Sequence, residues 1–289
     1  MNNYPNLASR VLSCPLLIEP GRAQVILGAL SSRLNINELD YDGQVLSSSE
    51  LKQKASGFDR PPQRKTFQLL PGGIAYIPIT GTLVHRLGQI NPYSGMTGYD
   101  GLSVKLRSAM NDDEVKGILF DIDSPGGEVS GCFDLADQIR AARAKKPIWA
   151  FANELACSAA YALAASCGFV FTNRTGVLGS IGVLWVHTDH SGALKERGLN
   201  ITMIHAGSHK VDKNPYETLP DDVRSGVQSD LEDIRKIFGA TVAKGRNMPL
   251  KDVLATEART YAGHKALKVG LIDGVMPFSV MVSRFASSL

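Results

Sequence analysis

The stretch that most constrains the fold is Pro147–Thr172, with the sequence PIWAFANELACSAAYALAASCGFVFT. An apolar segment of strand-like composition leads through a short polar connection into a helix of small residues, and a second apolar segment follows. Ser158 lies where the connection enters the helix. A serine at this position either caps the first free N–H groups of the helix or acts as a nucleophile near the positive end of the helix dipole. The pattern alone leaves both interpretations open.

A second informative stretch is Gly117–Val129, where a buried-type strand runs into the sequence DSPGG at Asp123–Gly127. Two glycines after a proline allow positive φ angles and present N–H groups without side-chain obstruction. An ordinary turn between a strand and a helix has a similar composition, so this motif alone is a weak signal. Asp121 and Asp123 end the strand and are candidate triad acids or metal ligands, but a capping role for Asp123 in the turn is favoured.

The third stretch is Ile204–Leu219, in which Lys210 lies in a loop rich in Gly, Ser, Asn and Pro. A single loop lysine is usually a solvated charge. A lysine can take the proton of a serine hydroxyl only when it is neutral, which requires burial away from carboxylates. Lys210 is therefore a candidate general base only in combination with Ser158.

Read together, these stretches resemble the signal peptide peptidase A family of serine–lysine peptidases. The motifs that carry the resemblance are Asp123–Gly127, Cys157–Tyr161, Thr175–Val183 and Gly207–Lys210. The resemblance implies that Ser158 attacks the peptide bond and that Lys210 is its base. It also implies that Ser180 forms a hydrogen bond with the lysine and orients it.

The same resemblance implies an oxyanion hole, a fold and an assembly. The N–H groups of Gly127 and Ala159 are the expected oxyanion donors, and Gly126 allows the substrate to approach. The implied fold is α/β and ClpP/crotonase-like, built from stacked ββα units, with an N-terminal helical arm and a C-terminal helical part. Members of the family assemble into rings or domes, so we expect a homo-oligomer, and no cofactor or metal is expected.

The resemblance is closer to phage head-maturation proteases of the lambda type, and it extends over nearly the whole chain. The segments that carry it are Leu16–Leu30, Pro92–Leu102, Gly207–Tyr216 and Leu219–Arg224. The substrates implied are the phage scaffold, portal and capsid proteins and the protease itself, in the host cytoplasm inside the assembling prohead. Lambda-type proteins continue into a scaffold extension, whereas this sequence stops at Leu289, which leaves self-processing open.

We predict three regions along the chain: an arm and linker over 1–65 with a helix after Pro20, a peptidase domain over 66–276 and a tail over 277–289. Within the domain, strands alternate with helices, as expected for βαβ units. Strands are also predicted at Ser180–Val186 and Ile201–Ile204, and a Gly-rich loop at Gly81–Thr97. The clearest helix is Pro220–Lys244, whose apolar stripe suits core packing or a subunit contact.

Composition excludes several classes of protein. The net charge is +3 and no dense Lys/Arg tract occurs, so nucleic-acid binding is not expected. No secretory signal is evident, and the uncharged run Leu155–Asn173 is too weakly apolar for a membrane span. The four cysteines lack metal-ligand spacing, which argues against a zinc site or a disulfide framework. Cys157 is beside Ser158, but a buried cysteine is a better interpretation than a nucleophile.

Several alternatives compete with the Ser158/Lys210 interpretation. A histidine could be the base, as in Ser-His-Asp ring peptidases, with candidates His187, His190, His205 and His209. Crotonase-fold acyl-CoA enzymes share paired oxyanion N–H groups and would not need a Ser/Lys pair. A bacterial signal-peptide or membrane-peptide peptidase and a non-catalytic capsid scaffold or assembly protein are the remaining alternatives.

Overall fold

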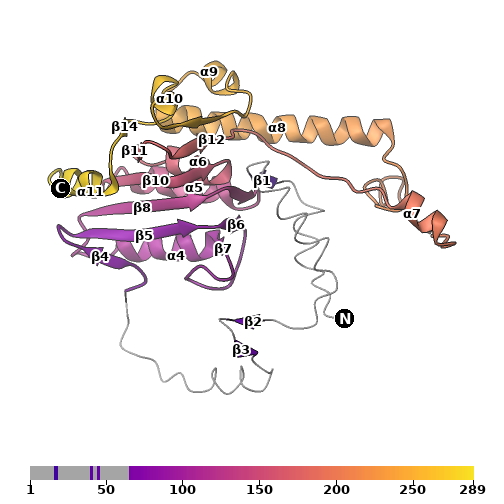
Figure 1. The fold of residues 1–289 in the computed structure, drawn as a ribbon, viewed down its shortest axis with the longest axis horizontal. Coiled ribbons are helices and arrows are strands. Elements are labelled where there is room, and N and C mark those ends of the chain that lie inside the picture. Colours follow the sequence, from indigo (N-terminus) through magenta and orange to yellow (C-terminus); the bar gives the residue numbers. More distant parts are fainter. Residues whose placement is uncertain (1–15, 19–39, 42–43, 46–64) are drawn as a thin grey trace.

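The computed structural model describes residues 16–18, 40–41, 44–45 and 65–289. The helix predicted after Pro20, and most of the arm predicted over 1–65, lie outside these residues. Two short strands, β2 (Asp40–Tyr41) and β3 (Gln44–Val45), pair with each other. Residues 65–289, together with a short strand at Leu16–Ile18, form two β-sheets with helices packed on them (Figure 1).

The larger sheet has eight strands and a parallel centre. Its order is β13-β12-β10-β8-β5-β4, and β11 pairs with both β10 and β14. The parallel strands are β5 (Ile74–Thr80), β8 (Gly117–Ser124), β10 (Ile148–Cys157), β11 (Phe169–Thr172), β12 (Val177–Gly179) and β14 (Gly274–Val275). Two antiparallel strands are β4 (Gln68–Leu70) and β13 (Thr260–Ala262). Because parallel neighbours need crossover connections, helices separate these strands along the chain.

Both faces of the larger sheet are covered, as a parallel sheet requires. Along β8, Phe120 and Ile122 contribute to the main core, whereas Leu119 belongs to a second cluster on the opposite face. The helices of the main core that follow successive strands are α4 (Tyr99–Met110), α5 (Cys132–Ala142) and α6 (Ala159–Ala165). The predicted α/β class is therefore confirmed.

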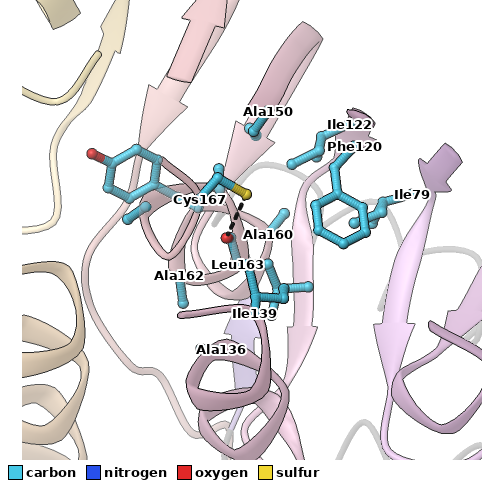
Figure 2. Packing of buried hydrophobic residues seen from close by; sticks show 14 of the residues in the cluster. Ile79, Phe120, Ile122, Ala136, Ile139, Ala150, Ala160, Ala162, Leu163 and Cys167 are labelled. Atoms are coloured by element: carbon cyan, nitrogen blue, oxygen red, sulfur yellow. Dashed lines mark hydrogen bonds between the residues drawn. The ribbon is translucent and has the colours of Figure 1, made fainter. Parts of the chain in front are cut away.

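Helix α6, the small-residue helix of the sequence analysis, lies at the centre of the core. Every residue from Ala159 to Ala165 is buried. Figure 2 shows Ala160, Ala162 and Leu163 of this helix among apolar side chains of the sheet and of α5. Because alanine side chains are short, neighbouring backbone approaches closely: a Cβ on Gly245 would lie 2.0 Å from the carbonyl oxygen of Ala165.

The long helix α8 (Asp221–Arg246) divides into a packed half and a projecting half. Near its C-terminal end, Phe238 and Val242 are fully buried on the predicted stripe. The N-terminal half extends away from the sheets together with α7 (Ser191–Glu196) (Figure 1). The strands predicted at Ser180–Val186 and Ile201–Ile204 were wrong, because neither stretch pairs along a sheet edge as a strand.

The C-terminal region forms α9 (Leu250–Leu254), α10 (Gly263–Lys268) and α11 (Phe278–Ala286). Residues 277–289, set apart as a tail by the sequence, contribute α11 to the second core. Met281 and Phe285 are fully buried, and the ring of Phe285 stacks on Trp149 with centroids 4.5 Å apart. Their helical spacing from Phe278 explains why one face of α11 covers the sheet.

The smaller sheet has the order β1-β9-β6-β7. Its strands are β1 (Leu16–Ile18), β9 (Gly126–Glu128), β6 (Thr82–Val84) and β7 (Met96–Gly98). Strand β9 pairs in parallel with β6 and antiparallel with β1. The stretch predicted as a Gly-rich loop at Gly81–Thr97 thus also contains β6 and the start of β7.

An ion pair anchors the end of α8 to the body. Arg246 donates two hydrogen bonds to the carboxylate of Asp273, at 2.7 and 2.9 Å, and Asp273 also accepts the N–H of Val170 at 2.7 Å. The side chain of Arg246 is 6% exposed and that of Asp273 29%. A bidentate pair of this kind is much less accessible to water than the surface pair of Arg140 and Asp137.

Arg246→Met is expected to lower the free energy of unfolding by about 2 kcal/mol, because the Asp273 carboxylate keeps only part of its hydrogen bonding in a partly buried place. Urea denaturation followed by circular dichroism measures the change. Arg140→Met, which removes an exposed pair, is the matched control and is expected to cost less than about 0.5 kcal/mol. Equal losses in the two variants would contradict an anchoring role for Arg246.

Candidate active site

Ser158 occupies a strained turn between β10 and α6. Its backbone has φ 54° and ψ −123°, a region that residues with a side chain rarely adopt and that costs on the order of 1–3 kcal/mol. Two hydrogen bonds hold the turn: the N–H of Ser158 donates to the carbonyl of Gly179 at 2.8 Å, and the Ser158 carbonyl accepts the N–H of Ala162 at 3.0 Å. Strain of this kind persists only where the surrounding structure enforces it.

The Ser158 hydroxyl does not cap the helix that it precedes. It makes no capping hydrogen bond, and its oxygen is buried with no hydrogen-bond partner among the described residues. A buried hydroxyl without a partner is uncommon in a folded protein and needs an explanation. The capping interpretation is thereby excluded, and the hydroxyl remains available for chemistry.

The DSPGG motif places β9 in contact with α6, the helix that Ser158 precedes. Ser124 organises this turn: its hydroxyl donates to the carbonyl of Gly81 at 2.6 Å and accepts the N–H of Gly126 at 3.2 Å. Gly126 has φ +101°, which favours glycine. A Cβ on Gly127 would lie 1.8 Å from the carbonyl oxygen of Leu83, so only glycine fits there. Since Ser124 already binds the Gly126 N–H, Gly127 is the stronger candidate donor for an oxyanion.

Ser180 directly follows β12, the strand that pairs with the end of β10 just before Ser158. β12 pairs in parallel with the end of β10, with Gly179 opposite Cys157, so Ser158 and Ser180 each come directly after one of two adjacent strands. Ser180 is 4% exposed and has φ 55°. Its N–H donates to the carbonyl of Arg259 at 3.0 Å. The structure therefore brings Ser158, Ser180 and the β9 glycines to one region.

Lys210 lies elsewhere on the chain, in the segment 187–219 that contains α7. Its side chain is exposed, and the Ser158 oxygen has no hydrogen-bond partner among the described residues, so the two groups do not form a dyad contact within one chain. The segment carries exposed apolar side chains, and Ile204 is 96% exposed. Figure 1 shows this segment extending from the body with the N-terminal half of α8.

None of the four candidate histidines forms a hydrogen bond with Ser158 in the described structure. His187 contacts the carbonyl of Asn214 at 2.9 Å. His205 contacts the carbonyl of Gly207 at 2.9 Å, and His209 the carboxylate of Asp212 at 2.8 Å. His190 is exposed and precedes α7. These partners all belong to the 187–219 segment itself.

Cys157 is fully buried, and its Sγ lies 3.8 Å from the carbonyl oxygen of Val177. This agrees with its interpretation as a packing residue.

Sequence reasoning missed two features of the site. The first is Ser124, which a serine before Pro-Gly-Gly could have indicated as a turn residue. The second is the irregularity of β10 between Ala152 and Ala156, with Glu154 at φ 78°, for which the polar residues inside an apolar run were the available signal.

Asp121 is held by Tyr76, not by a catalytic base. The Tyr76 hydroxyl donates to its carboxylate at 2.5 Å. Burial raises the pKa of Asp121, and hydrogen bonds from Tyr76 and Asn153 oppose that rise. Asp121 lies two residues after Leu119 on β8, so alternation directs it to the face covered by α11, opposite to the face of α6. A role as triad acid to Ser158 is therefore not supported.

Asp121→Asn is expected to stabilise the protein at neutral pH. A carboxyl whose pKa is raised by folding contributes its stabilisation below its unfolded pKa, about 4, and loses it as pH rises through the folded pKa. The asparagine avoids this loss, with a gain below about 1 kcal/mol at pH 7 after solvent screening. Thermal melts at pH 7 and pH 3.5 measure it, with the exposed Asp113→Asn as control. A gain of equal size at both pH values would contradict the assignment.

Within the described part of the chain, no cluster of three or more His, Cys, Asp or Glu side chains could hold a metal ion. Across the same residues, no helix has the length and apolar character needed to cross a membrane.

Comparison with known proteins identifies the family. The model of peptidase family S49 matches residues 140–288, which is just over half of the chain and includes the α6 turn. The chain belongs to peptidase family S49. Capsid assembly protease C of Escherichia phage lambda is 41% identical over 278 residues, covering 94% of this chain and 63% of that protein. Head-tail preconnector protein GP5 of Enterobacteria phage P21 is 39% identical over 293 residues, covering 99% of this chain and 58% of that protein.

A putative signal peptide peptidase SppA of Enterococcus faecium is more distant, at 25% identity over 245 residues, covering 83% of this chain and 66% of that protein. The predicted resemblance to signal peptide peptidase A, nearer to the lambda type, is thus confirmed. The S49 match together with the parallel centre of the larger sheet and its crossover helices also confirms the predicted ClpP/crotonase-like fold. The chain spans about three fifths of the length of the two phage relatives.

Proposed function

We propose that this S49 family member is a serine endopeptidase with Ser158 as its nucleophile. The observation that carries the proposal is the Ser158 hydroxyl, buried and without a hydrogen-bond partner among the described residues, at a strained turn beside the tandem glycines of β9. A strained turn that presents an unbonded hydroxyl close to the backbone N–H groups of a glycine strand is suited to acyl transfer.

The chemistry follows from these positions. The Ser158 oxygen attacks the carbonyl carbon of a peptide bond, and a neutral lysine, Lys210, takes the hydroxyl proton. The carbonyl oxygen becomes an oxyanion that the N–H groups of Gly127 and Ala159 stabilise. Protonated Lys210 then gives its proton to the leaving amine, and water hydrolyses the acyl-enzyme. Ser180, at the end of the neighbouring strand, orients the lysine.

The base is proposed to come from a second copy of the chain. Lys210 is exposed, whereas a lysine must be shielded from water to act as a base near neutral pH. Its segment also exposes Leu199, Ile201 and Ile204, which a neighbouring copy would cover. A head-to-tail contact, in which the 187–219 segment of one copy reaches the Ser158 turn of the next, forms a ring when the rotation between copies closes.

The substrates are proposed to be the proteins of an assembling phage head, namely scaffold, portal, capsid protein and the protease itself. The similarity to a phage capsid assembly protease over 94% of this chain supports this proposal. Cleavage would then occur in the host cytoplasm, inside the prohead, where substrates are concentrated around the enzyme.

The test is mass spectrometry of products after the chain is mixed with the neighbouring scaffold and portal proteins. Discrete cuts are expected from the wild type and not from Ser158→Ala or Lys210→Ala. The matched controls are Ser166→Ala, a buried serine at the other end of α6, and Lys213→Ala in the lysine loop. Cuts that survive in Lys210→Ala would indicate that a histidine is the base. Cuts that survive in Ser158→Ala would show that Ser158 is not the nucleophile.

A further inference from the structure

The edge of β9 next to the Ser158 turn is occupied by the chain's own N-terminal strand. β1 pairs antiparallel with β9 in the register Leu16 opposite Glu128, Leu17 opposite Gly127 and Ile18 opposite Gly126. The residue opposite the middle of β1 is therefore Gly127, the proposed oxyanion donor. Figure 1 shows β1 beside the end of the body where β6 lies.

The opposite edge of β9 is not available to another strand. β6 pairs there, with Leu83 opposite Gly127, and β7 follows β6 in the same sheet. The fit at this side is so close that a Cβ on Gly127 would meet the Leu83 backbone. A peptide that joins this sheet next to β9 therefore has to take the place of β1.

A peptide substrate would use the same edge. An extended peptide binds a sheet edge through main-chain hydrogen bonds, and such pairing would bring its carbonyl groups to Gly127 beside Ser158. Neighbouring strands lie about 4.8 Å apart, so one edge accepts one strand at a time. β1 and a substrate strand thus exclude each other.

From these contacts we infer that β1 is an internal competitor for the substrate edge of β9, which rests on Ser158 being the nucleophile proposed above. β1 is only three residues long, and short strand pairings are marginal by themselves. Its covalent attachment makes docking intramolecular, which raises its effective concentration over that of a free peptide. Substrate binds only after β1 has left the edge. The fraction of molecules in which the β9 edge is free therefore sets the apparent affinity for substrate.

The first experiment measures hydrogen exchange at residues 126–128 in the Ser158→Ala background, where no turnover occurs. Leu17→Pro places a proline in the centre of β1, which the pairing does not tolerate. Exchange at β9 is expected to be about tenfold faster than in the parent. The matched control is Val45→Pro, in the β2–β3 pair, which does not join this sheet. Equal exchange in the two proline variants would overturn the docking of β1.

The second experiment measures the binding of fluorescein-labelled casein to the same variants by fluorescence anisotropy. If β1 occupies the edge about nine tenths of the time, Leu17→Pro binds casein about tenfold more tightly, and Val45→Pro does not. A synthetic peptide of residues 13–21 is expected to compete with casein for the Leu17→Pro variant. Equal casein affinity in the two proline variants overturns the competition.

A separate measurement keeps this inference distinct from the proposed function. A small fluorophosphonate phosphonylates an activated serine without pairing to a strand edge. Its reaction with the wild type at Ser158, located by mass spectrometry, needs no strand pairing, so Leu17→Pro is expected to raise its rate less than it raises casein binding. No labelling of Ser158 would overturn the nucleophile while leaving the exchange result valid. A labelling rate that rises as much as casein binding would mean that β1 shields the serine itself, and would overturn competition confined to the strand edge.

Discussion

Co-expression of Ser158→Ala with Lys210→Ala in one cell is expected to restore peptidase activity that neither variant has alone. In one chain the Ser158 oxygen has no hydrogen-bond partner among the described residues, and Lys210 is exposed on the projecting 187–219 segment. If neighbouring copies share the site, the Lys210→Ala chain supplies an intact serine and the Ser158→Ala chain an intact lysine. If the two variants mix at random in a ring, about a quarter of the shared sites contain both an intact Ser158 and an intact Lys210.

The design needs differently tagged chains and a two-step purification, so that only mixed oligomers are assayed by cleavage of the scaffold protein. Ser158→Ala co-expressed with Lys213→Ala is the positive control, because the Lys213→Ala chain retains both proposed groups. Ser158→Ala co-expressed with itself is the negative control. If the positive control is active and the Ser158→Ala/Lys210→Ala pair is not, each site uses groups from one chain, and the segment must fold back onto its own serine.

Much of the fold could be predicted from local pattern. The apolar runs and small-residue helix of 147–172 became β10, α6 and β11, because a parallel strand buried on both faces needs an uninterrupted apolar sequence. The packed end of α8 could be predicted from its apolar stripe, because one face of that helix is buried against the core. The strands predicted at 180–186 and 201–204 failed, since a short apolar run forms a strand only where a partner edge exists, and sequence does not reveal that edge.

The candidate site was predictable only in part. The serine turn and the Pro-Gly-Gly turn could be found from spacing, because their glycines and small residues are required by the backbone. The sequence could not show that Ser158 and Lys210 make no contact within one chain, because a motif identifies residues and not their distance in the fold. The pairing of β1 with β9 was also missed: three residues carry too little periodicity to show a strand.

Gly127→Ala is expected to lower kcat by about 100- to 1000-fold, the usual cost of losing one oxyanion donor. The added Cβ would lie 1.8 Å from the Leu83 carbonyl oxygen and 2.6 Å from its carbonyl carbon and nitrogen. Backbone atoms of a paired strand cannot turn aside as a flexible side chain can, so β9 must shift away from β6. That shift is expected to move the Gly127 N–H away from the position proposed for the substrate oxyanion next to Ser158.

The loss should appear mainly in kcat, because the oxyanion exists only in the transition state and its donor contributes little to ground-state binding. Steady-state cleavage of a scaffold-derived peptide measures kcat and KM, and a thermal melt establishes that the variant is folded. Gly226→Ala is the control: its Cβ meets nothing within 4 Å on α8, and alanine there favours the helix. A folded Gly127→Ala enzyme with kcat within tenfold of the wild type would show that β9 tolerates the shift, and the oxyanion donor would then have to be sought at Ala159 alone.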